Sequence, residues 1–223
     1  MPLEIKVTAD GSPTIYSPDL NEHYHSINGA FTESKHVFID AGFLEKQKAG
    51  LQNINILEIG LGTGLNLMLT KKYNSAFAGK LVYHALEPYP LEFDMIIGLE
   101  KFDLKNFGID PSIFSYIHKE PFEQEISMGS DFVFYKINKT LENFLPCSHY
   151  DLVYFDAFGP QVQPEVWAEE NFRKLYHCMN PSGILVTYCA KGAVRRSMQA
   201  VGFTVERLPG PPGKREMLRA TKK

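Results

Sequence analysis

Three acidic residues stand at positions where a carboxylate could meet a small ligand: Glu58, Glu87 and Asp156. Glu58 lies two residues before a series of alternating glycines, which are Gly60, Gly62 and Gly64. Because glycine has no Cβ atom, the backbone there can bend sharply and come close to a bound molecule. Carboxylates attract cationic ligands, and a carboxylate can hold an amine in place for reaction. Asp156 follows a short apolar run and is our candidate catalytic residue.

The glycines stand between an apolar run at 54–59 and a helix-like segment at 65–78. A strand, a glycine turn and a helix form the opening unit of a doubly wound α/β domain, where ligands bind at the carboxyl ends of the strands. A dinucleotide-binding turn reads G-x-G-x-x-G, whereas this turn reads G-x-G-x-G. That spacing resembles the first motif of S-adenosylmethionine-dependent methyltransferases. A glycine-rich turn without a ligand is the alternative.

Further strands and helices follow in alternation. The predicted strands are 81–86, 131–137, 151–155 and 184–189; the predicted helices are 93–101, a second before residue 128, 167–179 and 191–201; and a hairpin joins 203–208 to 216–221. This alternation predicts an α/β fold with a Rossmann-like sheet, as in class I S-adenosylmethionine-dependent methyltransferases.

Two residues at strand ends are candidates for nucleoside contacts. Glu87 ends the strand at 81–86, about 20 residues after the glycines, where an acid can accept hydrogen bonds from ribose hydroxyls. Asn138 ends the strand at 131–137, near the expected place of the adenine ring, although a simple turn residue fits that position equally well.

Residues 1–50 do not fit the wound sheet and predict a small N-terminal extension, with the methyltransferase domain at 51–223. A hairpin is expected from 4–9 and 14–16, and a helix from Glu33 or Ser34 through Leu44. Polar and aromatic side chains crowd the segment around Tyr24. We interpret it as a cap over the glycine turn; a polar surface helix is the alternative.

The net charge of −3 is unevenly distributed: nine basic and two acidic residues from Lys191 onward give +7, against −10 for the first 190 residues. A basic end on an acidic body is a candidate contact for a polyanion, and a solvated surface is the alternative. No apolar run reaches the ~20 residues of a membrane span, and the N-terminus lacks the features of a secretory signal. The three cysteines form no metal-ligand pattern. These features predict a cytoplasmic protein without a membrane anchor or a metal.

Asp156 suits the chemistry of methyl transfer to an amine. An acidic side chain can accept a hydrogen bond from the amine and aim its lone pair at the methyl group. Positioning and electrostatics then carry most of the reaction, and no covalent nucleophile is required. Phe158, two residues later, could stack on a flat acceptor. The alternative is that Asp156 only caps the following turn.

Four segments occur in the order found in one family: LEIGLGTGLN, DAFGPQVQPEVW, GAVRRSMQAVGF and GKREML. They resemble the methyltransferase domain of MnmC and its stand-alone form MnmD, and YHSINGAFTESKHVF resembles the N-terminal part of that family. The resemblance implies N-methylation of 5-aminomethyl-2-thiouridine to 5-methylaminomethyl-2-thiouridine at the wobble position of certain tRNAs, with S-adenosyl-L-methionine as methyl donor.

The candidate residues then have assigned roles. The cofactor-binding candidates are Glu58, Gly60, Gly62, Gly64, Asn66, Glu87 and Asn138. The candidates for contacts with the acceptor nucleotide or tRNA are Tyr24, Phe158, Lys191, Arg195, Arg196, Lys214 and Arg215. Two positions depart from the family pattern: Asn138 replaces an acid that is common there, and Gln161-Val162-Gln163 replaces small and basic residues.

Two-part members of the family also carry a flavin-dependent oxidase. The 223 residues here hold no such part, so we expect only the methyl step, without flavin, and a separate enzyme that supplies the aminomethyl intermediate. Other readings of the same residues are a methyltransferase for a small-molecule or protein amine, an aminopropyltransferase-like enzyme, and a nucleotide-binding module without chemistry.

Overall fold

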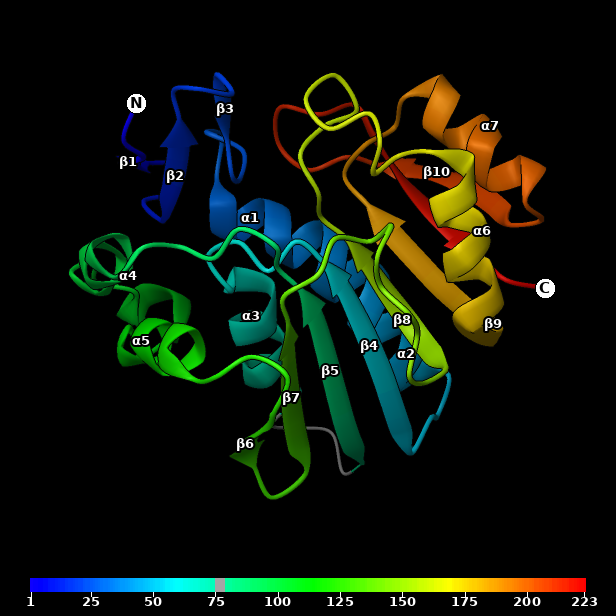
Figure 1. Ribbon diagram of the computed structural model, residues 1–223, viewed down its shortest axis with the longest axis horizontal. Coiled ribbons are helices and arrows are strands. Elements are labelled where there is room, and N and C mark those ends of the chain that lie inside the picture. Colours follow the sequence, from blue (N-terminus) through cyan, green and yellow to red (C-terminus); the bar gives the residue numbers. More distant parts are fainter. Residues whose placement is uncertain (75–78) are drawn as a thin grey trace.

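The computed structural model describes residues 1–74 and 79–223, so the predicted end of the helix at 65–78 lies outside the described residues. Within this part of the chain, eight strands form one mixed sheet (Figure 1). Its strands, in spatial order, are β10 (Thr204–Pro209), β11 (Glu216–Thr221), β9 (Met179–Thr187), β8 (Tyr150–Phe155), β4 (Asn53–Ile59), β5 (Lys80–Leu86), β7 (Phe132–Ile137) and β6 (Glu125–Gly129). The predicted α/β class is confirmed.

The five central strands run parallel and carry the site. They read as apolar runs because helices cover both of their faces. From β4 the chain first adds β5 and β7 on one side and later returns to β8 on the other. Ligands bind in α/β sheets at such a reversal, outside the carboxyl ends of the strands. Since Ile59 is level with both Leu86 and Phe155, the residues that follow these strands emerge at one edge.

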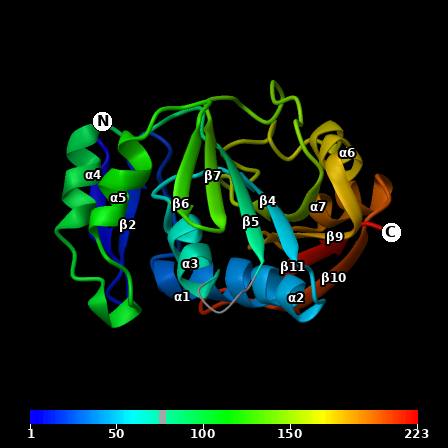
Figure 2. The same ribbon diagram turned by 90° about the horizontal axis from the view of Figure 1, so that it is seen from below.

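Seven α-helices are described, and two further helical segments join them. They are α1 (Ala30–Ser34), the π-helix η1 (Lys35–Phe43), α2 (Leu44–Lys48), α3 (Leu65–Asn74), α4 (Phe93–Glu100), the 3-10 helix η2 (Lys105–Phe107), α5 (Ser112–Lys119), α6 (Glu169–Cys178) and α7 (Gly192–Ala200). Helices α1, α2 and α3 lie along one side of the sheet, and α6 lies on the other (Figure 2). Two apolar cores result, one on each face of the sheet.

The N-terminal residues form a second sheet of β1 (Glu4–Val7), β2 (Pro13–Ser17) and β3 (Glu22–His23). The predicted hairpin is therefore confirmed, and β3 adds a strand to it. Asp10 ties this hairpin to α1, because its carboxylate accepts the N–H groups of Ser12 at 3.0 Å and of Thr32 at 2.9 Å. Burial opposes ionisation, but hydrogen bonds from Ser12, Thr32 and Thr8 lower the pKa of Asp10 to about 2.

The predicted N-terminal helix is present but begins earlier, at Ala30, and continues through η1 into α2. Its apolar face packs on the sheet at Gly42, where an added Cβ would lie 3.2–3.3 Å from the side chains of Val186, Leu152 and Tyr154. This close approach holds the N-terminal segment against β8 and β9, beside the carboxyl edge of the sheet.

Two sequence predictions on this sheet need correction. The second helix expected before residue 128 is present as α5 but ends at Lys119, and residues 125–129 form β6, an unpredicted strand antiparallel to β7. Only Ile126 and Met128 are buried there, a two-residue period that belongs to a strand. Strand β9 begins at Met179 rather than Ile184, directly after α6. The helices at 167–179 and 191–201 are confirmed with trimmed ends, as is the final hairpin.

Candidate active site

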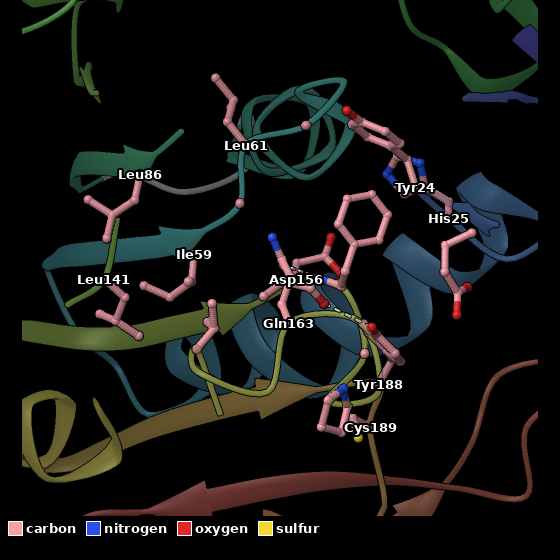
Figure 3. Close-up of a pocket in the computed structure, with 18 of the residues that line it drawn as sticks. Tyr24, His25, Ile59, Leu61, Leu86, Leu141, Asp156, Gln163, Tyr188 and Cys189 are labelled. Carbon is pink, nitrogen blue, oxygen red and sulfur yellow. Dashed lines mark hydrogen bonds between the residues drawn. The ribbon is translucent and has the colours of Figure 1, made fainter. Parts of the chain in front are cut away.

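A cavity of about 570 Å³ opens at the carboxyl ends of β4, β5 and β8 (Figure 3). It is lined by short segments from most of the chain: 22–27 with Glu33, 59–62, 86–89, 139–142, 156–161 with Gln163, Glu165 and Val166, and 188–191 with Lys214. The N-terminal segment and the C-terminal loop thus meet the glycine turn around one space.

The glycine turn needs its glycines for two different reasons. All three have positive φ, at +90° for Gly60, +53° for Gly62 and +82° for Gly64, a region that other residues rarely adopt. An added Cβ would lie 2.9 Å from the Asp156 carbonyl oxygen at Gly60, and 3.2 Å from the Tyr24 ring at Gly62. Gly60 and Gly62 line the cavity, whereas Gly64 faces Ile117 and packs against α5.

Glu87 braces this turn from the end of β5. One carboxylate oxygen accepts the Gly62 N–H at 2.8 Å, and the other accepts the Tyr89 N–H at 2.9 Å. Burial raises the pKa of Glu87, although both hydrogen bonds and Lys136 favour the charged form. Glu87, directly after β5, therefore lines the cavity and fixes the backbone of the glycine turn.

Glu58 supports the site from below, because it is fully buried and does not line the cavity. Its two oxygens accept hydrogen bonds from the Asn66 amide and the Tyr83 hydroxyl, each at 2.9 Å. The same Asn66 nitrogen donates to Asp156 at 2.8 Å. Asn66 thus joins two carboxylates. Like Glu58, Asn66 does not line the cavity, so of the three joined residues only Asp156 faces it.

Asp156 lies at the centre of these contacts, directly after β8 and against the cavity (Figure 3). Its backbone N–H donates to the Ile59 carbonyl at 3.0 Å, which fixes it beside the glycine turn. Burial is the largest cause that raises the pKa of its carboxyl well above the usual range, and Glu33 adds to the shift. The Asn66 hydrogen bond and Lys214 act in the opposite direction.

Hydrogen bonds from three side chains, or to them, hold the backbone of the loop after Asp156. The Phe158 N–H donates to Gln163 at 3.1 Å, and the Phe158 carbonyl accepts the Trp167 indole N–H at 2.7 Å. Tyr188 donates its hydroxyl hydrogen to the Ala157 carbonyl at 2.8 Å. These bonds present the Phe158 ring edge-on to Tyr24, with centroids 5.1 Å apart. Gln163 and Trp167 therefore hold Phe158 in place, and the Phe158 and Tyr24 rings form an aromatic wall of the cavity.

Comparison with known proteins agrees with this geometry. A family model described as S-adenosyl-L-methionine-dependent methyltransferase matches residues 114–223. A tRNA 5-methylaminomethyl-2-thiouridine biosynthesis bifunctional protein MnmC from Cupriavidus necator is 30% identical over 231 residues, covering 97% of this chain and 34% of that protein. The chain belongs to the MnmC methyltransferase-domain family.

Other relatives extend this result. The protein of the same name from Pseudomonas entomophila is 28% identical over 214 residues and covers 91% of this chain. The chain spans about a third of the length of these curated relatives. The crystal structure of MNMC2 from Aquifex aeolicus shares the fold, with a TM-score of 0.82 and 24% identity over 100% of this chain and 71% of that one. The sugar N-methyltransferase KedS8 from Streptoalloteichus is a more distant fold match, at 0.51 and 12%, over 86% and 88% of the two chains.

In this MnmC-family domain the expected basic contacts separate into two groups. Lys191 and Lys214 line the cavity, and their ammonium groups bind Gln161 and Glu33. Arg195, Arg196 and Arg215 do not line it; Arg195 is half-buried, and the other two are exposed.

Asn138 also lies outside the cavity lining. It is exposed, and its backbone N–H donates to Glu123 at 3.2 Å. The four residues that follow, 139–142, line the cavity instead. Gln161 bridges Lys191 to Glu22, whose carboxylate accepts at 3.1 Å, so the departure from the family pattern joins both sides of the opening.

Sequence reasoning assigned no role to four cavity residues: His25, Glu33, Tyr188 and Gln163. His25 and Glu33 belong to the crowded polar segment near Tyr24. The crowding indicates a functional segment but does not say which side chains face the ligand. Tyr188 had a usable signal, since it stands near the end of the predicted fifth strand, at the edge where ligands bind. In the described part of the chain, no group of His, Cys, Asp and Glu residues could hold a metal ion, and no helix is long and apolar enough to cross a membrane.

Proposed function

We propose that this domain is an N-methyltransferase that converts 5-aminomethyl-2-thiouridine to 5-methylaminomethyl-2-thiouridine at the wobble position of tRNA. The observation that carries the proposal is the half-buried Asp156 carboxylate, which faces the cavity directly beside the glycine turn. Relatives named for the biosynthesis of this nucleoside match nearly the whole chain, and this supports the choice of acceptor.

The cavity residues fit S-adenosyl-L-methionine. The backbone at Gly60 and Gly62 leaves room that a Cβ would fill, and Glu87 offers a carboxylate near it. These residues would hold the cofactor, which supplies an electrophilic methyl group when bound. Acidic groups suit a ligand that carries sulfonium and ammonium charges.

Asp156 performs the positioning in this proposal. Its carboxylate accepts an N–H hydrogen bond from the acceptor amine, so that the nitrogen lone pair points away from Asp156 toward the methyl donor. Asn66 fixes the carboxylate through the 2.8 Å hydrogen bond. Methyl transfer then depends on alignment in a water-poor cavity, which is where fixed dipoles and charges act most strongly.

The acceptor base and the tRNA have separate supports. The Phe158 ring, with Tyr24 edge-on to it, gives a flat uracil an aromatic wall at the cavity. Arg195, Arg196 and Arg215 lie outside the cavity, where they would meet the phosphates of a bound tRNA.

We also propose that residues 1–50 act as a cap on the methyltransferase domain at 51–223. Residues 22–27 and Glu33 contribute to the lining of the cavity, which supports this division of roles. In such a cap, Tyr24 restricts the approach to Gly62, since a Cβ there would already touch its ring.

Single-turnover methylation tests the proposal. The substrate is a tRNA that carries 5-aminomethyl-2-thiouridine, and mass spectrometry of the nucleosides should show one added methyl group at the wobble position. The same tRNA with an unmodified wobble uridine is the control and should gain none. Equal methylation of free amines or proteins, or aminopropyl transfer from decarboxylated S-adenosylmethionine in place of methylation, would contradict the proposed function.

A further inference from the structure

An ion pair closes one side of the cavity with residues from opposite ends of the chain. The Lys214 ammonium binds the Glu33 carboxylate, and both residues line the cavity. The Glu33 side chain is 7% exposed and that of Lys214 is 31% exposed, so this is not a surface pair. Glu33 also accepts the Ser26 N–H at 3.0 Å, which fixes its carboxylate within the cap.

Tyr188 links Lys214 to the segment that carries Asp156. The Lys214 nitrogen lies 3.9 Å from the centroid of the Tyr188 ring, within the range of a cation–π contact. The Tyr188 hydroxyl in turn holds the carbonyl of Ala157, the residue next to Asp156. A paired cation and anion therefore line the same cavity as Asp156.

The two charges act on Asp156 in opposite directions. Glu33 raises the pKa of the Asp156 carboxyl and Lys214 lowers it, on top of a larger rise from burial. The other ionisable groups around them include Glu58, which Asn66 joins to Asp156, and Tyr188, whose pKa is raised by burial, by Asp156 and by its neighbours Cys189, Glu33 and Glu22. Burial lowers the pKa of His25 to about 4, so this neighbour is uncharged at neutral pH.

Resting on the proposed function, we infer that Glu33 and Lys214 are positioning residues that set the proton state at the methyl-transfer point. Lys214 favours the ionised form of Asp156 and disfavours the ammonium form of the acceptor, whereas Glu33 opposes both effects and holds Lys214 in place.

The chemistry of the acceptor requires such a device. A primary alkylamine is mostly an ammonium ion at neutral pH, and an ammonium nitrogen has no lone pair to form the new bond to carbon. The proton must leave for bulk water before the attack. A second cation fixed nearby in a low-dielectric cavity promotes that loss, because two like charges repel strongly there. The rate should then rise with pH through an inflection that marks deprotonation of the bound amine.

The first test needs no substrate. Carbon-13 NMR of the labelled aspartate carboxyls gives the titration of Asp156, with Asp156→Asn for its assignment. Lys214→Met should raise the titration midpoint by about 1 pH unit, and Glu33→Gln should lower it. The double variant, which lacks both charges, should return toward wild type. Lys222→Met is the matched control: Lys222 lies 5.0 Å from the Tyr176 ring, but it does not line the cavity, so Asp156 should titrate as in wild type.

The second test uses the tRNA substrate. In single-turnover methylation against pH, the inflection should move upward in Lys214→Met and downward in Glu33→Gln, while Lys214→Arg, which keeps the charge, should leave it in place. Thermal melts set the conditions at which each variant is folded. Loss of rate with no movement of either inflection, or movement in the same direction for both, would show that the pair is only a structural tie and overturn the inference. If the wild type methylates no such tRNA, the proposed function fails, and the NMR titration alone decides whether the pair controls Asp156.

Discussion

The two sides of the cavity are built in different ways. The side with the glycine turn comes from strand ends that are neighbours in the sheet, with Gly60 after β4 and Glu87 after β5. The opposite side joins the N-terminal segment to the C-terminal loop through Glu33 and Lys214, which are 181 residues apart in sequence. The first side comes from two consecutive parallel strands and the turn between β4 and α3, and the second exists only when distant segments meet. We expect mutations on the two sides to separate cofactor binding from acceptor chemistry.

Gly62→Val should have the largest effect on cofactor binding. Its φ of +53° is unfavourable for valine, and a Cβ would lie 3.2 Å from the Tyr24 ring. Calorimetry should show that the affinity for S-adenosylhomocysteine falls by roughly 100-fold or more. Gly50→Val is the control, because Gly50 has a similar φ of +77° with no atom within 4 Å of an added Cβ. Normal binding by the Gly62 variant would remove this turn from the cofactor site.

Asp156→Ala should reduce the single-turnover methylation rate by on the order of 100-fold, because the acceptor nitrogen loses its fixed hydrogen-bond partner. Asp156→Asn should retain part of the rate if the carboxylate only orients the amine, since an amide oxygen still accepts a hydrogen bond. Both variants should bind S-adenosylhomocysteine within a few-fold of wild type. An alanine variant that methylates at the wild-type rate would exclude Asp156 from the mechanism.

Trp167→Phe should weaken the acceptor side alone. It removes the indole N–H that donates to the Phe158 carbonyl at 2.7 Å and leaves a partly buried acceptor without its partner. The expected loss is about 1–2 kcal/mol of stability, read from denaturant unfolding, together with a higher KM for tRNA. Unchanged calorimetry with S-adenosylhomocysteine would confirm that the two sides are independent, whereas an equal loss of cofactor affinity would show that they are coupled.

Alanine at Arg195, Arg196 and Arg215 should have the smallest effect on the reaction and a clear effect on tRNA affinity. If these side chains bind phosphates, the slope of log affinity against log salt should decrease by roughly 1 for each phosphate that is no longer neutralised. The exposed Lys101, on the short turn after α4, provides the control substitution. A triple variant with the wild-type affinity and slope would show that this surface is only solvated.

The sequence was sufficient for the central sheet and for one side of the cavity. Strands β4, β5 and β8 carry continuous apolar runs, which follow from burial on both faces. Gly60, Gly62, Glu87 and Asp156 could be placed because residues after parallel strands emerge at one edge. Strand β6 was not predicted, because its alternating pattern spans only five residues and directly follows a helical pattern.

The other side of the cavity could not be predicted for a physical reason. Lys214 stands in a basic region, so its charge alone pointed to a phosphate, yet its ammonium binds Glu33 inside the cavity. Nothing in the spacing of two residues near opposite ends of a chain reports that they meet. The prediction for Asn138 missed the cavity by one residue: Asn138 is exposed, and the next four residues line the cavity.

The long separation of Glu33 and Lys214 also bears on the order in which the molecule assembles. Pairings between residues far apart in sequence form slowly, because a large loop must close before they contribute. Glu33 is buried in the N-terminal segment, and its ion pair with Lys214 forms only after the Lys214 loop has docked. We therefore expect the strand–turn–helix unit around Gly60 and Gly62 to be ordered early in folding. The side of the cavity that contains Glu33 and Lys214 should form last, when the final hairpin docks on β9.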